Sequence, residues 1–302
     1  EDLFAGAVRY MRIYFLGMPA IALYNFGSGV LSAIGDTQRP LRYLTIAGVL
    51  NVVLNLFFVI ICKLDVAGVA IASTVSQYVS AGLILRSLLR SGECYALRLS
   101  ALRFYRGKTG RILAIGLPTA LQNSLFALAN LFVQGAVNTF DTVMVEGNSA
   151  AANADALVYD VMAAIYTGCS SFIGQNLGAG KMDRVRRSYL VALAFSFGTG
   201  AVMGGALLVF GRSFLAVFTS EPAVIEMGMR RLSIMGFTYG VSAFMDCTIA
   251  ACRGLGRTVV ATVLVILGSV VFRIAWIYTV FAYYHTIPSL YLLYVFSWSL
   301  TA

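Results

Sequence analysis

The sequence has few charged residues and few of the residue types that build catalytic or metal sites. Charged residues make up 12% of its 302 residues and hydrophobic residues 59%, whereas about a quarter of a soluble domain is charged. Its one histidine is His285, and its five cysteines lack the paired spacing of metal ligands or of a disulfide framework. These shortages exclude a soluble globular domain and indicate a polytopic membrane protein, in which the cysteines pack as small apolar residues.

Motifs for membrane catalysis and for nucleotide binding are missing as well. The sequence contains no His-Glu-x-x-His motif and no paired aspartate-rich motif. The Gly-Ala-Gly-Lys run at 178–181 resembles part of a phosphate-binding loop. However, Gln175 stands where the first glycine belongs, and Met182 stands where Ser or Thr must hold a metal. We therefore expect neither an enzyme nor a phosphate site.

Long apolar segments dominate the chain, and most are near the ~20 residues that cross a bilayer as a helix. Lipid requires backbone groups to pair within a segment, so we expect an all-α fold. A polar outer loop is predicted at 141–153, and the last segment is the shortest. Nine transmembrane helices are predicted, at 8–34, 43–62, 66–89, 112–140, 154–172, 188–210, 227–252, 259–281 and 287–302.

The net charge of +9 is distributed unequally between the two sides of these segments. One side carries 15 of the 22 cations, including the basic turn at 181–187, and the positive-inside rule predicts that it is cytoplasmic. This pattern indicates topology and not nucleic-acid binding. Within a segment we expect only Arg273; the outer side holds Arg9, Arg12, Lys63, Arg212, Arg230 and Arg231.

An internal repeat divides the chain into two parts. Residues 16–37 match residues 235–258, and both copies cross inward and end in a Gly-x-Thr-like basic turn. We expect three helices of one lobe at 1–97, a cytoplasmic amphipathic linker at 98–110 and six helices of a second lobe at 111–302. An irregular solvated loop is the alternative for the linker. Halves repeated in the same orientation are typical of transporters.

Four motifs make the chain resemble the multidrug and toxic compound extrusion (MATE) transporters. They are GQNLGAGK at 174–181, RGLGRT at 253–258, AIGDT at 33–37 and GLP at 116–118. The resemblance implies helices four to twelve of a twelve-helix, two-lobe, pseudo-symmetric fold, so we expect about three further helices before Glu1. It also implies a multi-pass protein of the cell membrane that exchanges Na+ or H+ for organic, often cationic, compounds and needs no other cofactor.

Polar residues inside the segments are candidates for ion coupling and substrate binding, because each is costly in lipid. A carboxylate there can carry a proton or hold Na+ with help from amide oxygens. Interhelical hydrogen bonding is the alternative role for the amides. The candidates are Asp246, Asp160, Gln122, Asn123, Asn130, Tyr159, Asn51, Asn55 and Arg273.

The identity of the coupling ion and of the substrate stays open at this point. In several relatives the seventh helix carries a carboxylate, whereas the segment at 112–140 has none and offers Gln122 near that depth. We expect small organic cations and the lipid bilayer as partners, and no nucleic acid. The alternative function is that of a lipid-linked saccharide flippase of the same superfamily, which would favour a cationic cavity over an acidic one.

Overall fold

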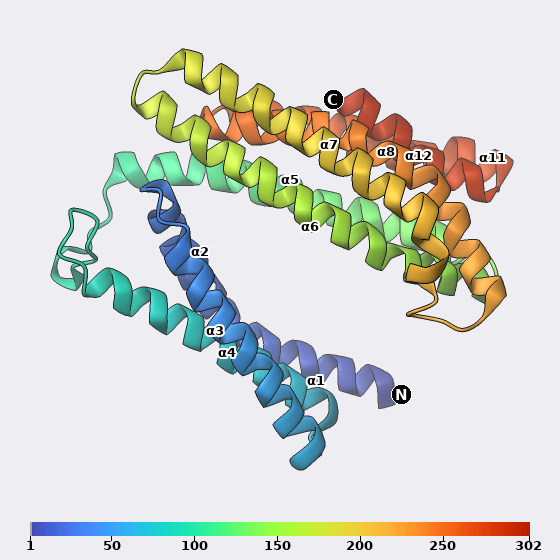
Figure 1. Cartoon of the computed structure of the whole chain (residues 1–302), viewed down its shortest axis with the longest axis horizontal. Coiled ribbons are helices and arrows are strands. Elements are labelled where there is room, and N and C mark those ends of the chain that lie inside the picture. Colours follow the sequence, from blue (N-terminus) through green and yellow to red (C-terminus); the bar gives the residue numbers. More distant parts are fainter. Residues whose placement is uncertain (1) are drawn as a thin grey trace. The chain divides into compact units, whose positions relative to one another are not determined.

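The computed structural model describes residues 2–302, and these residues are helical apart from short turns and loops (Figure 1). Seven helices are long and apolar enough to cross a membrane, and a bent helix pair makes an eighth span. The last helix, α12 (Ile287–Thr301), is apolar and shorter. The predicted all-α polytopic membrane fold is therefore confirmed. The chain forms two compact units, Glu1–Phe104 and Tyr105–Ala302.

In the first unit, α4 (Asp65–Leu89) packs against the three other helices of the unit. The predicted span at 8–34 is a pair of helices, α1 (Asp2–Leu16) and α2 (Met18–Ala33), that bend by 43° around Gly17. Pro19 lies in the first turn of α2, where its missing N–H costs no hydrogen bond. The remaining helix, α3 (Gln38–Leu56), continues into a wide π-helical turn, η1 (Phe57–Ile61).

The segment between the units is mostly irregular. It contains one 3₁₀ turn, η2 (Leu99–Ala101), flanked by extended residues, and the next helix begins at Arg106. Residues 91–105 contain no α-helix, so the segment has no continuous amphipathic helix, and Leu99, Leu102 and Phe104 are exposed. The structure thus matches the alternative of an irregular loop. The boundary between the units, after Phe104, lies inside the predicted linker.

The second unit contains five segments that are long and apolar enough to span a membrane, and the shorter apolar helix α12. The first four are single helices: α5 (Arg106–Val137), α6 (Thr142–Gly178), α7 (Met182–Leu215) and α8 (Pro222–Gly254). The fifth segment runs from Thr258 to Tyr284 and is followed by α12. Within the unit, α8 is the most buried span, and it packs against α6, α7 and α12 (Figure 1).

Close packing around α8 depends on glycines that face one another. A Cβ atom on Gly204 of α7 would lie 2.1 Å from the carbonyl oxygen of Gly236 on α8. On α6, a Cβ atom on Gly147 would lie 2.8 Å from the backbone nitrogen of Gly228 on α8. Small residues let helix backbones approach in this way, which drives helix association in membranes.

The predicted outer loop at 141–153 is wrong, because α6 already begins at Thr142. Asp141 caps this helix: its Oδ1 accepts a hydrogen bond of 3.0 Å from the backbone N–H of Met144. The following residues include Ala150, Ala151 and Ala152, and alanine is the strongest helix former. Polarity alone therefore misled the prediction, which placed Asn148 in a loop.

The fifth segment of the second unit alternates α-helical and wider π-helical turns. It consists of α9 (Thr258–Val265), η3 (Ile266–Val271), α10 (Phe272–Trp276), η4 (Ile277–Phe281) and α11 (Ala282–Tyr284). Turns of this kind inside α-helices are frequent at functional sites. Here they flank α10, which carries Arg273.

Three basic turns share one backbone geometry. Gly35, Gly180 and Gly256 have φ of +90°, +71° and +73° and follow the ends of α2, α6 and α8. In each turn the residue after the glycine donates its N–H to a carbonyl five residues earlier, as Arg257 does to Cys252 at 2.8 Å. This is a glycine-based helix cap, which needs a positive φ. The cap after Gly35 and the cap after Gly256 end the two copies of the sequence repeat.

Candidate functional site

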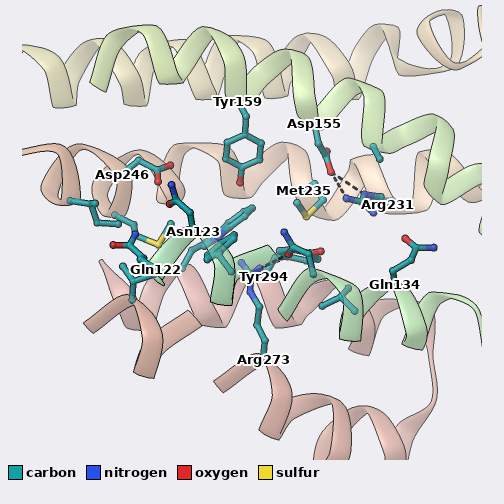
Figure 2. A pocket seen from close by; sticks show the side chains of 18 of the residues that line it. Gln122, Asn123, Gln134, Asp155, Tyr159, Arg231, Met235, Asp246, Arg273 and Tyr294 are labelled. Atoms are coloured by element: carbon teal, nitrogen blue, oxygen red, sulfur yellow. Dashed lines mark hydrogen bonds and ion pairs between the residues drawn. The ribbon is translucent and has the colours of Figure 1, made fainter. Parts of the chain in front are cut away.

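A cavity of about 480 Å³ lies within the second unit. Its walls come from α5, α6, α8, the segment at 258–284 and α12, and the volume falls in the range of small-molecule sites. Along α8 the lining extends from Arg231 to Arg253, which is about 33 Å at 1.5 Å per residue. In Figure 2, Tyr159 points into the cavity between Asp246 on one side and Asp155 on the other.

One part of the cavity is built around Asp246. Its side chain is partly buried, and its Oδ2 is fully buried without a hydrogen-bond partner in the described part of the chain. Gln122 and Asn123 of α5 line the cavity near it (Figure 2). The side chain of Gln122 is fixed by Thr262, whose hydroxyl donates a hydrogen bond of 3.3 Å to Oε1 of Gln122. A carboxylate oxygen without a partner, in a cavity that amide side chains also line, can receive a proton or a small cation.

The opposite part of the cavity contains a buried ion pair between α6 and α8. Arg231, 8% exposed, donates through Nε and Nη2 to Oδ2 of Asp155, 7% exposed. Tyr239 donates to the other oxygen of Asp155, and Asn148 accepts hydrogen bonds from Arg231 and, at 2.9 Å, from Tyr291 of α12. The expectation that only Arg273 lies within a segment is therefore wrong: Arg231 is buried in α8 as well, where it pairs with a buried carboxylate.

Aromatic rings and a third arginine occupy the middle of the cavity. The Arg273 guanidinium lies 4.6 Å from the ring centroids of both Phe126 and Tyr294. Its Nε donates to Ser297 at 3.2 Å and its Nη1 to Asn130 at 3.1 Å. Figure 2 shows the side chain extending from α10 toward Tyr294. Arg273 is fully buried, as expected for a charge inside a span.

The structure brings six of the predicted site residues together at this cavity and leaves three elsewhere. The six are Gln122, Asn123, Asn130, Tyr159, Asp246 and Arg273. Asp160 has an exposed side chain on α6 and is not among the lining residues. Asn51 and Asn55 belong to the first unit, where Asn51 donates to Ser76 of α4 at 3.3 Å and Asn55 donates to Asn51. The contact of Asn51 matches the alternative role of hydrogen bonding between helices, whereas that of Asn55 lies within α3.

Several lining residues were missed by the sequence analysis, above all Asp155 and Asn148. Both fell in or beside the wrongly predicted loop. A signal was present: Asn148, Asp155, Tyr159 and Tyr166 recur at spacings of seven, four and seven, which places them on one helix face. Reading the alanine-rich stretch before 154 as helix would have revealed that face.

Membrane-spanning helices around a polar cavity are typical of membrane transporters. The MatE family model matches residues 1–57 and 118–279, which is more than half of the chain. The chain belongs to the MatE family, whose members are transporters and not enzymes. It is accordingly a multi-pass membrane protein.

Relatives with curated names include the probable multidrug resistance protein YpnP of Bacillus subtilis, 28% identical over 240 residues, which is 79% of this chain and 53% of that protein. An FAD transporter of Shewanella oneidensis is 27% identical over 238 residues, 76% of this chain and 52% of that protein. The chain thus spans about half the length of these relatives.

Solved structures show the same fold. An outward-facing multidrug resistance MATE transporter of the MOP superfamily superposes with a TM-score of 0.90 at 22% identity, over 98% of this chain and 66% of that one. A MOP superfamily transporter from Pyrococcus furiosus gives a TM-score of 0.90 at 22% identity, over 98% of this chain and 67% of that one. The fold is therefore that of MATE transporters.

Proposed function

We propose that the chain is part of an antiporter that exports organic compounds in exchange for Na+ or H+, with Asp246 as the coupling carboxylate of the second unit. The observation that carries this proposal is the buried, unpartnered Oδ2 of Asp246 at a cavity between membrane-spanning helices. A carboxylate in that position is stable only when it is protonated, binds a cation or contacts water in the cavity. Binding and release of a cation there would couple the ion gradient to substrate movement.

Two polarities of substrate are candidates. Organic cations, the expectation from the family resemblance, are supported by the aromatic faces of Phe126, Tyr159 and Tyr294, which attract flat cations. Anions are supported by the three arginines against two aspartates in the cavity lining, and FAD, carried by the Shewanella relative, is an anion. A lipid-linked saccharide, the substrate of the alternative flippase function, is anionic as well.

The proposal is tested by transport measurements in proteoliposomes that contain the full-length protein and are loaded with a fluorescent substrate. An inward or outward gradient of Na+ or of protons is imposed in turn, and release of a fluorescent substrate is followed. We expect one gradient to drive exchange against the substrate gradient. Transport that ignores both gradients but requires a lipid-linked saccharide would instead support the flippase function.

A further inference from the structure

We propose that the guanidinium of Arg273 is the binding site for an anionic group of the substrate. The cavity of the second unit would then take flat aromatic compounds that carry a carboxylate, sulfonate or phosphate. This inference rests on the proposed export function and specifies its substrate class.

The charge balance of the cavity is the first argument. Five charged residues line it: three arginines and two aspartates. Arg231 and Asp155 form an ion pair and cancel each other. Asp246 and Arg253 are opposite charges on α8, seven residues apart, that offset each other in the net charge without forming an ion pair among the described residues. Arg273 remains, and no carboxylate among the described residues forms an ion pair with it. The cavity lining therefore carries one net positive charge, and Arg273 has no carboxylate partner.

The burial of Arg273 is the second argument. Its side chain is fully buried in a span, and arginine keeps its proton in proteins, so the charge cannot be removed by neutralisation. Ser297 and Asn130 accept hydrogen bonds from Nε and Nη1, but both acceptors are neutral. The Nη2 atom is buried and has no partner in the part of the chain that the structure describes. An anion would satisfy this donor and offset the buried charge.

The geometry around the guanidinium is the third argument. Phe126 and Tyr294, each at 4.6 Å, fix its position, while a ring face offers less than a full opposite charge. The planar fork of arginine matches a carboxylate or phosphate group. Tyr159 and Trp298 also line the cavity, with ring centroids 6.0 Å apart, and offer faces for a flat ring system. A cationic ligand in the same place would lie beside an uncompensated positive charge.

The test compares two xanthene dyes of similar shape and opposite charge, fluorescein and tetramethylrhodamine methyl ester. Their binding to the full-length protein in lipid nanodiscs is measured by equilibrium dialysis at low salt, with empty nanodiscs as the blank. We expect fluorescein to bind at least tenfold more tightly. Tighter binding of the rhodamine would overturn the proposal, and this comparison needs no variant.

Variants then assign the site. Arg273→Met should weaken fluorescein binding at least tenfold, and Arg273→Lys should keep part of it because the charge is retained. Arg212→Met is the matched control, since Arg212 is an exposed arginine of the same unit that pairs with Glu226 away from the cavity lining. Unchanged fluorescein binding in folded Arg273→Met, or an equal loss in Arg212→Met, would refute the assignment. If Arg273→Met does not fold, Arg273→Lys is compared with Arg212→Lys. Weaker fluorescein binding in Arg273→Lys alone supports the assignment, and equal binding in both variants refutes it.

The outcome is separable from that of the proposed function, because dye binding is measured without any ion gradient. Arg273-dependent fluorescein binding in a protein that shows no gradient-driven exchange would keep the site and remove the antiporter. Gradient-driven export of the rhodamine that is unchanged in Arg273 variants would support the antiporter and refute the anion site.

Discussion

At the scale of single residues, the buried pair of Arg231 and Asp155 is expected to matter most for stability. Asp155→Asn would leave Arg231 charged and unpaired in a membrane-spanning segment, and loss of one partner of a buried pair costs about 3–5 kcal/mol. We expect a large fall in the melting temperature of the purified protein.

A matched control is available in the second unit. Glu226→Gln breaks the ion pair of Glu226 with Arg212, in which the side chains are 47% and 71% exposed, respectively. An exposed pair contributes only about 0–1 kcal/mol. The double variant Asp155→Asn/Arg231→Met should recover part of the loss, because it leaves no unpaired charge. Equal melting temperatures for Asp155→Asn and Glu226→Gln would show that the buried pair does not stabilise the fold.

Asp246 is expected to act in ion coupling and not in folding, because one of its oxygens has no partner to lose. Asp246→Asn resembles the protonated carboxylate. We therefore expect it to retain folding and dye binding and to abolish gradient-driven exchange. Asp160→Asn, at an exposed carboxylate outside the cavity lining, should leave exchange intact. Exchange at the normal rate in Asp246→Asn would exclude this residue as the coupling site.

At the scale of helices, the contact of α7 with α8 is expected to be intolerant of one methyl group. Gly204→Ala would place a Cβ atom 2.1 Å from the backbone oxygen of Gly236, and backbone cannot rotate away as a side chain can. Overpacking of this kind costs about 1–3 kcal/mol. Gly205→Ala is the control, because a Cβ there meets nothing within 4 Å. Thermal unfolding of both variants should show a loss for Gly204→Ala alone.

The limits of prediction from sequence are also clearest for the helices. The spans were predictable because lipid demands long apolar segments, and Arg273 was found because a charge in such a segment is conspicuous. The start of α6 was missed because hydropathy does not register an alanine-rich, asparagine-containing helix. The pairing of Asp155 with Arg231 joins residues 76 positions apart, so no local pattern could reveal it.

At the scale of the whole molecule, the distribution of cations predicts the orientation in the membrane. Gly178 and Arg257 should face the cytoplasm, and Lys63 and His285 should face outward. In a cysteine-free version of the protein, Glu221→Cys lies in the connection between α7 and α8, on the predicted outer side. An impermeant maleimide added to intact cells should label it, and Arg257→Cys should react only after permeabilisation. The opposite pattern would invert the topology.

The two π-helical turns of the fifth segment change the direction in which the side chains after them point. A π-helical turn holds about one residue more than an α-helical turn, so each one rotates the helix that follows by about 100° around its axis. Deletion of one residue from η3 (Ile266–Val271) would join α9 and α10 into one regular α-helix and turn Arg273 away from Asn130, Phe126 and Tyr294. Insertions and deletions in this short stretch can therefore exchange the residue that faces the cavity without any substitution in the cavity lining.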